Sequence, residues 1–327
     1  MILVTGAAGY IGSILTEKLI DSGYQVVALD NLSKGHRSAV HKDAVFVKAD
    51  IGDRPAINGL FQNYTIDAVM HLAADTEVER SFAEPYHFFF NNVASPLNLL
   101  DCMLSNNVGT FIFSSSAAVY GEPAEIPVSE VTPTCPINPY GETKLMFEKI
   151  LHWFSRTKSL NSVALRYFNV AGASACLGED HKPASTLIAA IIDVATGNRD
   201  FLPVFGNDYD TKDGTCIRDF IHVVDIADAH IKALQYLQSK KGFHIFNLGN
   251  GDGYSVMEVI EAARKVTGKS IPVKLCPRRP GDPVNVISSA SLARSELHWK
   301  PSFPKIENLI ESAWIWQNQH PQGYNDF

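Results

Sequence analysis

The sequence predicts an α/β fold in which helices cover both faces of a parallel β-sheet. Short apolar runs, bounded by Gly, Asp, Asn or Ser, alternate with amphipathic helical stretches through the first half of the chain. Strands that are apolar throughout are typical of a parallel sheet buried on both faces. A glycine-rich turn, TGAAGYIG, joins the first apolar run directly to the first helical stretch. Together these observations predict a Rossmann-type, doubly wound fold that runs to about residue 175.

The expected strands follow one another at helix-sized intervals. The apolar runs are 1–6, 25–30, 44–50, 67–73, 110–116 and 162–169. The clearest helical patterns between them lie at 10–23 and 139–154. This order predicts the strand–helix–strand crossovers of a parallel sheet.

The pattern changes after residue 175. Turn-rich stretches occupy 172–185 and 205–215, and 243–249 resembles a strand that returns to the sheet. Loops and short helices are expected beyond it. Since no repeat or flexible linker separates the two regions, the second should pack on the first and form a cleft.

Composition and charge exclude several classes of protein. A formal net charge of −7 disfavours broad binding to nucleic acid or to an anionic membrane. No apolar run approaches the ~20 residues that span a bilayer, and the N-terminal MILVTGAAG runs straight into a strand without a signal-peptide pattern. The five cysteines include no CxxC pair, and the eleven histidines show no metal-ligand spacing. We therefore expect a cytoplasmic protein without disulfides or a bound metal.

The glycine-rich turn predicts a dinucleotide site. Gly6, Gly9 and Gly12 lie between the first strand and the first helix, although the first gap is one residue longer than in the usual GxGxxG pattern. Glycines allow the backbone and the helix N-terminus to approach a diphosphate closely. Asp30 ends the second strand, where a carboxylate accepts hydrogen bonds from ribose hydroxyls and repels a 2′-phosphate. NAD is therefore expected rather than NADP, a preference that nearby Lys34 weakens slightly.

A second constellation predicts redox chemistry at a carbinol. The fifth strand delivers Ser116 to its carboxyl end, and Tyr140 and Lys144 open the helix that follows. A nearby ammonium and the positive nicotinamide lower the pKa of a tyrosine, so that it can act as a base near neutral pH. The Tyr-xxx-Lys spacing alone decides nothing, because Tyr236 and Lys240 repeat it. That second pair lacks a serine-bearing strand before it and is interpreted as an ordinary helix-face contact.

The motifs together resemble one protein family. TGAAGYIG, HLAA, NNV, SSSAAVYG, YGETK and RYFNVAGA are similar to the extended short-chain dehydrogenase/reductases that act on nucleotide sugars. VFGNDYDTKDGTCIRDFIHVVDIADAH and CPRRPGD narrow this to the UDP-glucose 4-epimerase family, and the resemblance covers essentially the whole chain. It implies an isomerase of galactose metabolism that moves a hydride from C4 of a UDP-hexose to NAD. The hydride then returns to the opposite face of a 4-keto intermediate.

The resemblance also implies which residues bind each ligand. Besides the glycine loop, Ser116, Tyr140 and Lys144, the implied NAD contacts are Tyr10, Ile11, Asp30, Asn31, Asp50, Ile51, Leu72, Ala73, Asn92 and Phe168. Besides Ser116 and Tyr140, the implied UDP-sugar contacts are Asn169, Thr186, Leu187, Pro203, Val204, Phe205, Arg218, Arg279, Asp282 and Val286. Planar guanidinium groups suit the two phosphates of UDP. Arg218 could instead pair with Asp219 or Asp213, and Arg278 or Arg279 could be solvated surface charges.

The resemblance further predicts two domains and a homodimer. Residues 1–179, with about 217–250 returning to the sheet, would form the NAD-binding domain. About 180–216 and 251–327 would form a smaller, mixed α/β domain that binds the UDP-sugar. Related enzymes dimerise through the helices after strands four and five. The phenylalanines of HFFFNN (87–92) are interpreted as packing residues.

Three positions depart from the family pattern. Thr76 stands where a lysine is common, so one cofactor contact could be missing. Thr186 stands where Asn or His is usual. Val286 stands where some members carry a tyrosine that closes the sugar pocket, which leaves space for a 2-acetamido group. UDP-N-acetylglucosamine and its galacto epimer are therefore additional candidate substrates.

Four alternatives remain at this point. A 4,6-dehydratase needs an Asp-Glu pair after the strand-five hydroxyl, where this chain has Ala117 and Ala118. A dehydrogenase of a small carbonyl substrate would leave the UDP-like motifs unexplained. A catalytically silent NAD-binding sensor would typically lack the tyrosine or the lysine. An epimerase of UDP-pentoses or UDP-uronic acids would share nearly every motif.

Overall fold

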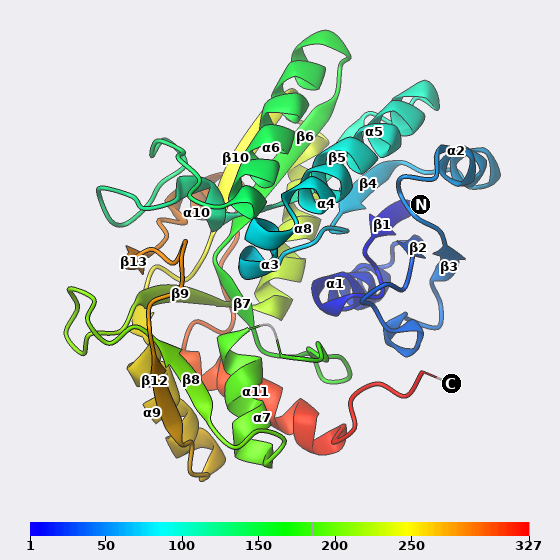
Figure 1. Ribbon diagram of the computed structural model, residues 1–327. Helices are drawn as coiled ribbons and strands as arrows, with labels where there is room; N and C mark the ends of the chain where they lie inside the picture. Colours follow the sequence, from blue (N-terminus) through cyan, green and yellow to red (C-terminus); the bar gives the residue numbers. More distant parts are fainter. Residues whose placement is uncertain (185, 327) are drawn as a thin grey trace.

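A seven-stranded parallel sheet forms the larger part of the molecule (Figure 1). The computed structural model describes residues 1–184 and 186–326. In spatial order the strands are β10 (Phe243–Leu248), β6 (Asn161–Tyr167), β5 (Thr110–Ser116), β4 (Ala68–His71), β1 (Ile2–Thr5), β2 (Val26–Asp30) and β3 (Val45–Lys48). The strand order reverses between β1 and β4, and such a switch point is where open α/β sheets bind ligands.

Helices cover both faces of this sheet, as predicted. On one face lie α1 (Tyr10–Asp21) and α8 (Val223–Leu237), which share an apolar core with every second strand residue. On the other lie α2 (Arg54–Asn63), α5 (Ser95–Ser105) and α6 (Pro139–Thr157). Neighbouring strand residues point to opposite cores, since Leu3 belongs to the second and Val4 to the first. The predicted Rossmann-type, doubly wound sheet is confirmed.

A smaller part with its own core lies beside the carboxyl edge of the sheet (Figure 1). Its strands are β7 (Asn169–Ala171), β8 (Leu202–Phe205), β9 (Ile217–His222), β11 (Gly253–Ser255), β12 (Val273–Cys276) and β13 (Asn285–Val286). Strand β9 pairs with β7, β11 and β13, and β8 pairs with β12. Of the strands in 217–250, only β10 therefore joins the large sheet. The division of the chain into two domains stays a prediction.

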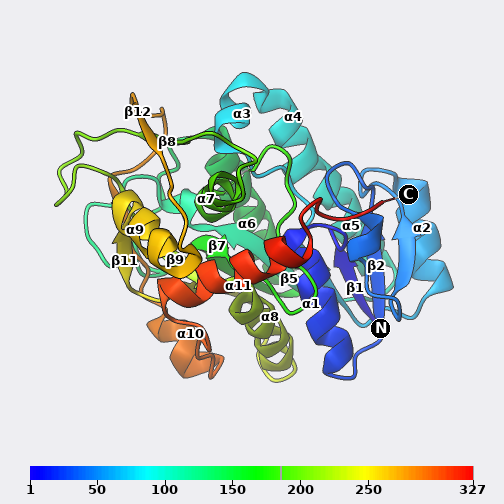
Figure 2. The same ribbon diagram turned by 90° about the horizontal axis from the view of Figure 1, so that it is seen from below.

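The helices of the smaller part are longer than the sequence suggested. Three of them, α7 (Leu187–Thr196), α9 (Val256–Thr267) and α11 (Ile306–Gln319), pack together around its core, and Figure 2 shows α11 passing between α7 and the N-terminal helix α1. Helix α9 begins with a complete capping box, in which Ser255 and Glu258 exchange hydrogen bonds with the backbone. This Ser-x-x-Glu signal was present in the sequence and could have predicted the helix.

Short elements complete the fold. They are η1 (Arg37–Ala39), α3 (Val78–Ala83), α4 (Pro85–Phe89), η2 (Phe90–Ala94), η3 (Ala117–Tyr120) and α10 (Ser291–Glu296). Within the described residues, no helix combines the length and the apolar character needed to cross a membrane.

Candidate active site

The glycine turn lies where β1 meets α1 and leaves no space for side chains. Gly6 has a φ of 70°, and a Cβ on it would lie 2.7 Å from the backbone nitrogen of Ala73. A Cβ on Gly12 would lie 2.0 Å from the carbonyl oxygen of Gly6. The helix starts at Tyr10 without a side-chain cap from Gly9. Its first N–H groups and positive dipole end can therefore receive a diphosphate, so the loop fits the predicted dinucleotide.

The acidic residues at the next two strand ends hold this edge together. Asp30 accepts hydrogen bonds from the backbone N–H groups of Ala8 (3.0 Å) and Leu32 (2.8 Å). The carboxylate thereby ties the glycine turn to the end of β2. Asp50 follows β3 and accepts a 2.8 Å hydrogen bond from the side-chain amide of Asn31. The structure thus brings the two predicted acids to the edge of the sheet where the adenosine of NAD is expected.

Lys34 occupies a position that the sequence did not reveal. Its ammonium lies 2.9 Å from Asp75 and 2.6 Å from Glu77, the two residues that flank Thr76. A cation is therefore present beside Thr76, but it comes from the loop after β2. The two carboxylates also compensate the charge of Lys34, which limits its attraction for a 2′-phosphate.

Other predicted cofactor residues differ in how their side chains are used. The amide of Asn92 exchanges hydrogen bonds of 2.9 and 2.8 Å with the backbone of Asp75, so it holds the segment after β4. Ile51 and Phe168 are buried, and Leu72 and Ala73 pack beside the apolar cores of the sheet.

The predicted triad converges at the carboxyl end of β5. Ser116 is the last residue of that strand, and its hydroxyl is near enough to Tyr140, in the first turn of α6, to influence the pKa of the tyrosine. Lys144 lies one helical turn later and donates a 2.9 Å hydrogen bond to the carbonyl oxygen of Ser114. The close approach depends on Gly141, because a Cβ there would lie 2.5 Å from the carbonyl oxygen of Ala118.

Burial controls the electrostatics of the triad. It raises the pKa of Tyr140, while the nearby hydroxyl of Ser116 acts in the opposite direction. Burial also lowers the pKa of Lys144 to about 7, and the negative charge of Glu148 opposes that change. For Tyr140 to act as a base near neutral pH, a charged Lys144 and a positive cofactor ring must therefore counteract the desolvation.

The second Tyr-xxx-Lys pair shows why the spacing alone was uninformative. The Lys240 ammonium lies 5.8 Å from the ring centroid of Tyr236, and the Lys144 ammonium lies 5.8 Å from that of Tyr140. Lys144 is only 3 % exposed, whereas Lys240 is exposed. The ammonium-to-ring distance is the same for both pairs, but Tyr140 and Lys144 both lie within α6, whereas Lys240 lies beyond the end of α8.

A charged cluster in the smaller part gathers several predicted UDP-sugar residues. Arg279 donates a 3.1 Å hydrogen bond to Asp282, and Arg218 lies 3.6 Å from the other oxygen of the same carboxylate. The guanidinium of Arg279 stacks 4.3 Å above the ring centroid of Phe205. Residues from β8, β9 and the segment before β13 thus meet around one carboxylate.

Arg218 does not pair with either of the acids that the sequence offered as alternatives. The carboxylate of Asp219 accepts hydrogen bonds from Ser288 and from backbone N–H groups, and that of Asp213 accepts them from Thr215 and Ser255. Within the described residues, the buried Nη2 of Arg218 has no hydrogen-bond partner. It is a donor that a ligand phosphate could use.

The remaining predicted substrate residues are placed differently from one another. Thr186 caps α7 by accepting a 3.3 Å hydrogen bond from Ala189 N–H, and it donates one of 2.7 Å to Glu179. Val204 is buried in the small core, so only its backbone could meet a ligand. Asn169 at the start of β7 is exposed. Leu187, Pro203 and Phe205 are half-buried.

Val286 is buried in an apolar cluster that links the two halves of the site. The cluster includes Phe168, Val119 and Leu145, and Val286 is the register partner of Arg218 in the small sheet. Its side chain therefore lies between the predicted cofactor and UDP-sugar residues.

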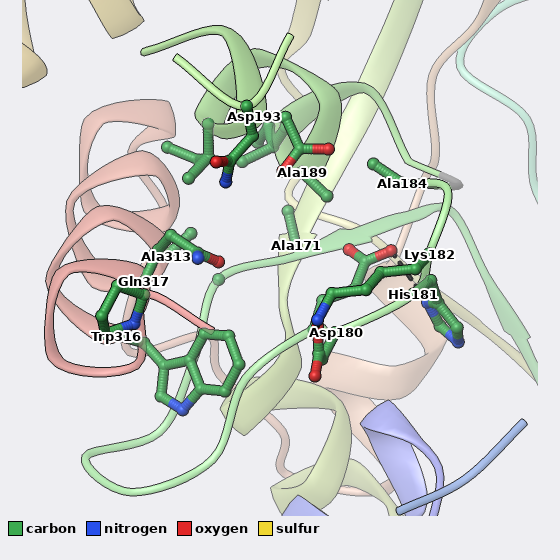
Figure 3. Close-up of a pocket in the computed structure, with 16 residues that line it drawn as sticks. Ala171, Asp180, His181, Lys182, Ala184, Ala189, Asp193, Ala313, Trp316 and Gln317 are labelled. Atoms are coloured by element: carbon green, nitrogen blue, oxygen red, sulfur yellow. Dashed lines mark hydrogen bonds and ion pairs between the residues drawn. The ribbon is translucent and has the colours of Figure 1, made fainter. Parts of the chain in front are cut away.

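A cavity in the described part of the chain lies elsewhere. Figure 3 shows Asp180, His181 and Lys182 on one side of it, with Trp316 and Gln317 of α11 on the other. None of the predicted site residues lines it. Within residues 1–184 and 186–326, no group of three or more His, Cys, Asp and Glu residues could hold a metal ion.

Sequence reasoning missed two further features of the site. Tyr209 is buried beneath the guanidinium of Arg278, and its hydroxyl has no hydrogen-bond partner in the described part of the chain. Glu148 lies one turn beyond Lys144 on the same face of α6 and is 2 % exposed. The four-residue spacing from Lys144 was a signal that could have identified Glu148.

A family model described as the NAD dependent epimerase/dehydratase family matches residues 2–249. The chain belongs to this family. UDP-glucose 4-epimerase from Halalkalibacterium halodurans is 48% identical over 326 residues, which cover 99% of this chain and 97% of that protein. These matches confirm the resemblance to UDP-glucose 4-epimerases that the motifs indicated.

Solved structures extend the comparison to ligands. UDP-glucose 4-epimerase from Bifidobacterium longum, in complex with NAD⁺ and UDP, is 40% identical with a TM-score of 0.95 and 99% coverage of both chains. The UDP-Glc/GlcNAc 4-epimerase from Campylobacter jejuni is 44% identical, with a TM-score of 0.84 and coverage of 97% of this chain and 99% of that one. NAD is the cofactor of the family, and the glycine turn described above fits it.

Gly12→Ala should abolish retention of NAD. The added Cβ would collide with the Gly6 carbonyl and displace the turn that holds the diphosphate. The measurement is the NAD released per protein chain after denaturation of the purified protein. Gly59→Ala is the matched control, because a Cβ there, in helix α2, meets nothing within 4 Å. Wild-type NAD content in Gly12→Ala would contradict the assignment of the loop.

Proposed function

We propose that this chain is an NAD-dependent UDP-hexose 4-epimerase that interconverts UDP-galactose and UDP-glucose. The observation that carries the proposal is the convergence of Ser116, Tyr140 and Lys144 at the carboxyl end of β5. The full-length similarity to UDP-glucose 4-epimerases supports the choice of substrate.

The triad residues divide the proton chemistry among them. Ser116 orients the 4-hydroxyl of the sugar, and Tyr140 accepts its proton. Lys144 stabilises the phenolate that must be present before this transfer. The glycine turn would hold NAD, which would supply the redox chemistry at C4, namely acceptance of a hydride and its return to the opposite face of the ring. Tyr140 then gives the proton back to the oxygen of the 4-keto intermediate, so no net oxidation occurs.

The charged cluster of the smaller part would hold the UDP moiety. Arg218 and Arg279 supply planar donors for diphosphate oxygens, and Asp282 keeps both guanidinium groups oriented before the ligand arrives. In this proposal residues 1–179 and about 217–250 form the NAD-binding domain, and about 180–216 and 251–327 form the UDP-sugar-binding domain, with Arg218 of the first reaching the ligand of the second. Binding from two sides leaves the sugar between them, beside the triad.

The structure disfavours the two main alternatives. Ala117 and Ala118 begin η3 directly after Ser116, so the acid and base of a dehydratase are missing at this place. A catalytically silent sensor needs no tyrosine base, yet Tyr140 and Lys144 are both present and buried against β5.

Tyr140→Phe should lower the turnover number at least about 10²-fold, because the general base is lost. The assay follows conversion of UDP-galactose to UDP-glucose by NMR with no added cofactor. Tyr236→Phe is the matched control, since Tyr236 has the same spacing to a lysine without the buried site. A fully active Tyr140→Phe would rule out this mechanism, and an inactive wild type, even with added NAD, would favour the sensor.

The protein should also turn over UDP-N-acetylglucosamine and its galacto epimer. Val286 leaves more room than a tyrosine would, and it adjoins both halves of the site. Val286→Tyr should therefore reduce turnover of the N-acetylated pair more than turnover of UDP-galactose. Val131→Tyr, at a position that is 91% exposed, controls for the substitution itself. If the wild type converts UDP-galactose rapidly but neither N-acetylated sugar, the valine does not widen specificity, and UDP-pentoses become the next substrates to test.

A homodimer is proposed through the helices after β4 and β5. Exposed apolar side chains gather there: Tyr86 and Phe90 stack on each other, and Met146 and Trp153 lie on the outer face of α6. Contacts between α4 and α6 make this one surface. Such side chains gain the most from burial against a second copy of the chain.

Trp153→Glu combined with Phe90→Glu should convert the dimer to a monomer of 35.9 kDa in sedimentation equilibrium. Leu275→Glu is the control, because Leu275 is equally exposed on the distant strand β12. A wild type that sediments as a monomer at micromolar concentration would contradict the proposed interface.

A cytoplasmic location is part of the same proposal. All five cysteines are unpaired, which suits a reducing compartment.

A further inference from the structure

A buried ion pair lies directly behind the catalytic pair. Tyr140, Lys144 and Glu148 succeed one another at four-residue intervals, so they share one face of α6. Glu148 is 2 % exposed, and its partner Arg166 on β6 is 3 % exposed. The proton chemistry described above uses neither residue.

Glu148 is hydrogen-bonded to β5, the strand that carries the catalytic serine. Its Oε1 accepts a 2.5 Å hydrogen bond from the hydroxyl of Ser115. Ser115 lies between Ser114, whose carbonyl oxygen holds Lys144, and Ser116. The carboxylate is thus attached to the strand segment that positions two members of the triad.

Arg166 fixes the carboxylate from the other side. Its Nε and Nη2 donate to the two oxygens of Glu148 at 3.0 and 2.6 Å, a bidentate pair. Its Nη1 donates a 2.8 Å hydrogen bond to the hydroxyl of Tyr120, which in turn donates one of 2.7 Å to Asn247. The network joins β5, β6, β10, η3 and α6 around the triad, and its members are almost completely buried.

Stability is a weak explanation for such a pair. Removing two charges from water is costly, and apolar residues of similar volume often stabilise a fold as well or better. A better explanation is that the pair keeps a negative charge close to Lys144. The Lys144 ammonium is surrounded by protein, and at low effective dielectric a carboxylate one turn away stabilises it substantially.

We propose that Glu148, locked in place by Arg166, is a positioning residue that keeps Lys144 charged and holds the Ser114–Ser116 segment in register with Tyr140. The proposal rests on the 4-epimerase function above. It adds a residue that supports the reaction without touching the substrate.

Among the described residues, Glu148 is the anion whose charge acts on Lys144. Burial, and next the charge of Lys144, lower the pKa of His71 on β4 to about 3, so its ring is neutral. Burial raises the pKa of Tyr167 on β6, so its hydroxyl stays protonated. Arg80 of α3 and His87 of α4 are directed at Asp75. Tyr120 of η3 bonds Arg166.

Glu148→Gln tests the electrostatic part of this proposal. Lys144 should lose its proton at lower pH, because the opposing anion is gone. The alkaline limb of the kcat–pH profile should therefore move down by about 1 unit or more, with KM little changed. An NMR titration of the Lys144 Nζ in the NAD-bound protein should show the same shift and requires no turnover. An unshifted Lys144 titration would overturn the proposal even if the wild type proved inactive in the epimerase assay.

Two further variants separate charge from packing. Tyr120→Phe removes hydrogen bonds to Arg166 and Asn247 but keeps both charges, so it should lower stability and leave the Lys144 titration in place. A shift equal to that of Glu148→Gln would overturn the electrostatic role. If Glu148→Gln does not fold, Glu148→Asp decides the question. It should keep the wild-type Lys144 titration and lower kcat, because the shorter carboxylate releases Ser115, and a wild-type kcat would refute positioning.

Discussion

The burial of the Lys144 ammonium is the constraint on which the catalytic half of the molecule depends. An unpaired cation in the interior is unstable, so the fold must supply acceptors and negative charge around it. Here the carbonyl oxygen of Ser114 and the nearby carboxylate of Glu148 do so. Both require the first turns of α6 to pack beside the end of β5, and Gly141 allows the helix to approach η3, which follows that strand. The position of Lys144, the charge of Glu148 and the glycine at position 141 therefore depend on one another.

The cofactor side obeys a different constraint, which is close backbone packing. Gly6 lies against Ala73, so the ends of β1 and β4 meet at the switch point of the sheet. Asp30 fastens the same turn to the end of β2. The triad arises from β5 and α6 at the same edge. A dinucleotide bound at the glycine turn can therefore extend toward Ser116 and Tyr140 without any rearrangement of the sheet.

The smaller part contributes charge that is organised before a ligand binds. Asp282 lies between Arg218 and Arg279, and the ring of Phe205 supports one of the guanidinium groups. An acidic protein can in this way present a local cationic surface to a diphosphate. Because β9 pairs with β7 as well as β13, the cluster is connected through a continuous sheet to the strand that follows β6.

The sequence by itself determined the local elements of the large sheet. Apolar runs predicted the seven strands of the large sheet, and the glycine spacing predicted the turn before α1. The order of Ser116, Tyr140 and Lys144 predicted the candidate catalytic residues. Each of these signals depends on residues close together in the chain.

Tertiary structure alone decided which distant side chains meet. Lys34 forms an ion pair with Asp75 beside Thr76. Arg218 pairs with Asp282 and not with the acids near it in the sequence. Arg166 forms a buried ion pair with Glu148. The two Tyr-xxx-Lys pairs make the reason explicit. The distance from ammonium to ring is the same in both, but Tyr140 and Lys144 are buried in the first turns of α6, whereas Lys240 is exposed beyond the end of α8. Periodicity specifies which face of a helix is apolar, but the partners on that face are selected by packing across the whole molecule.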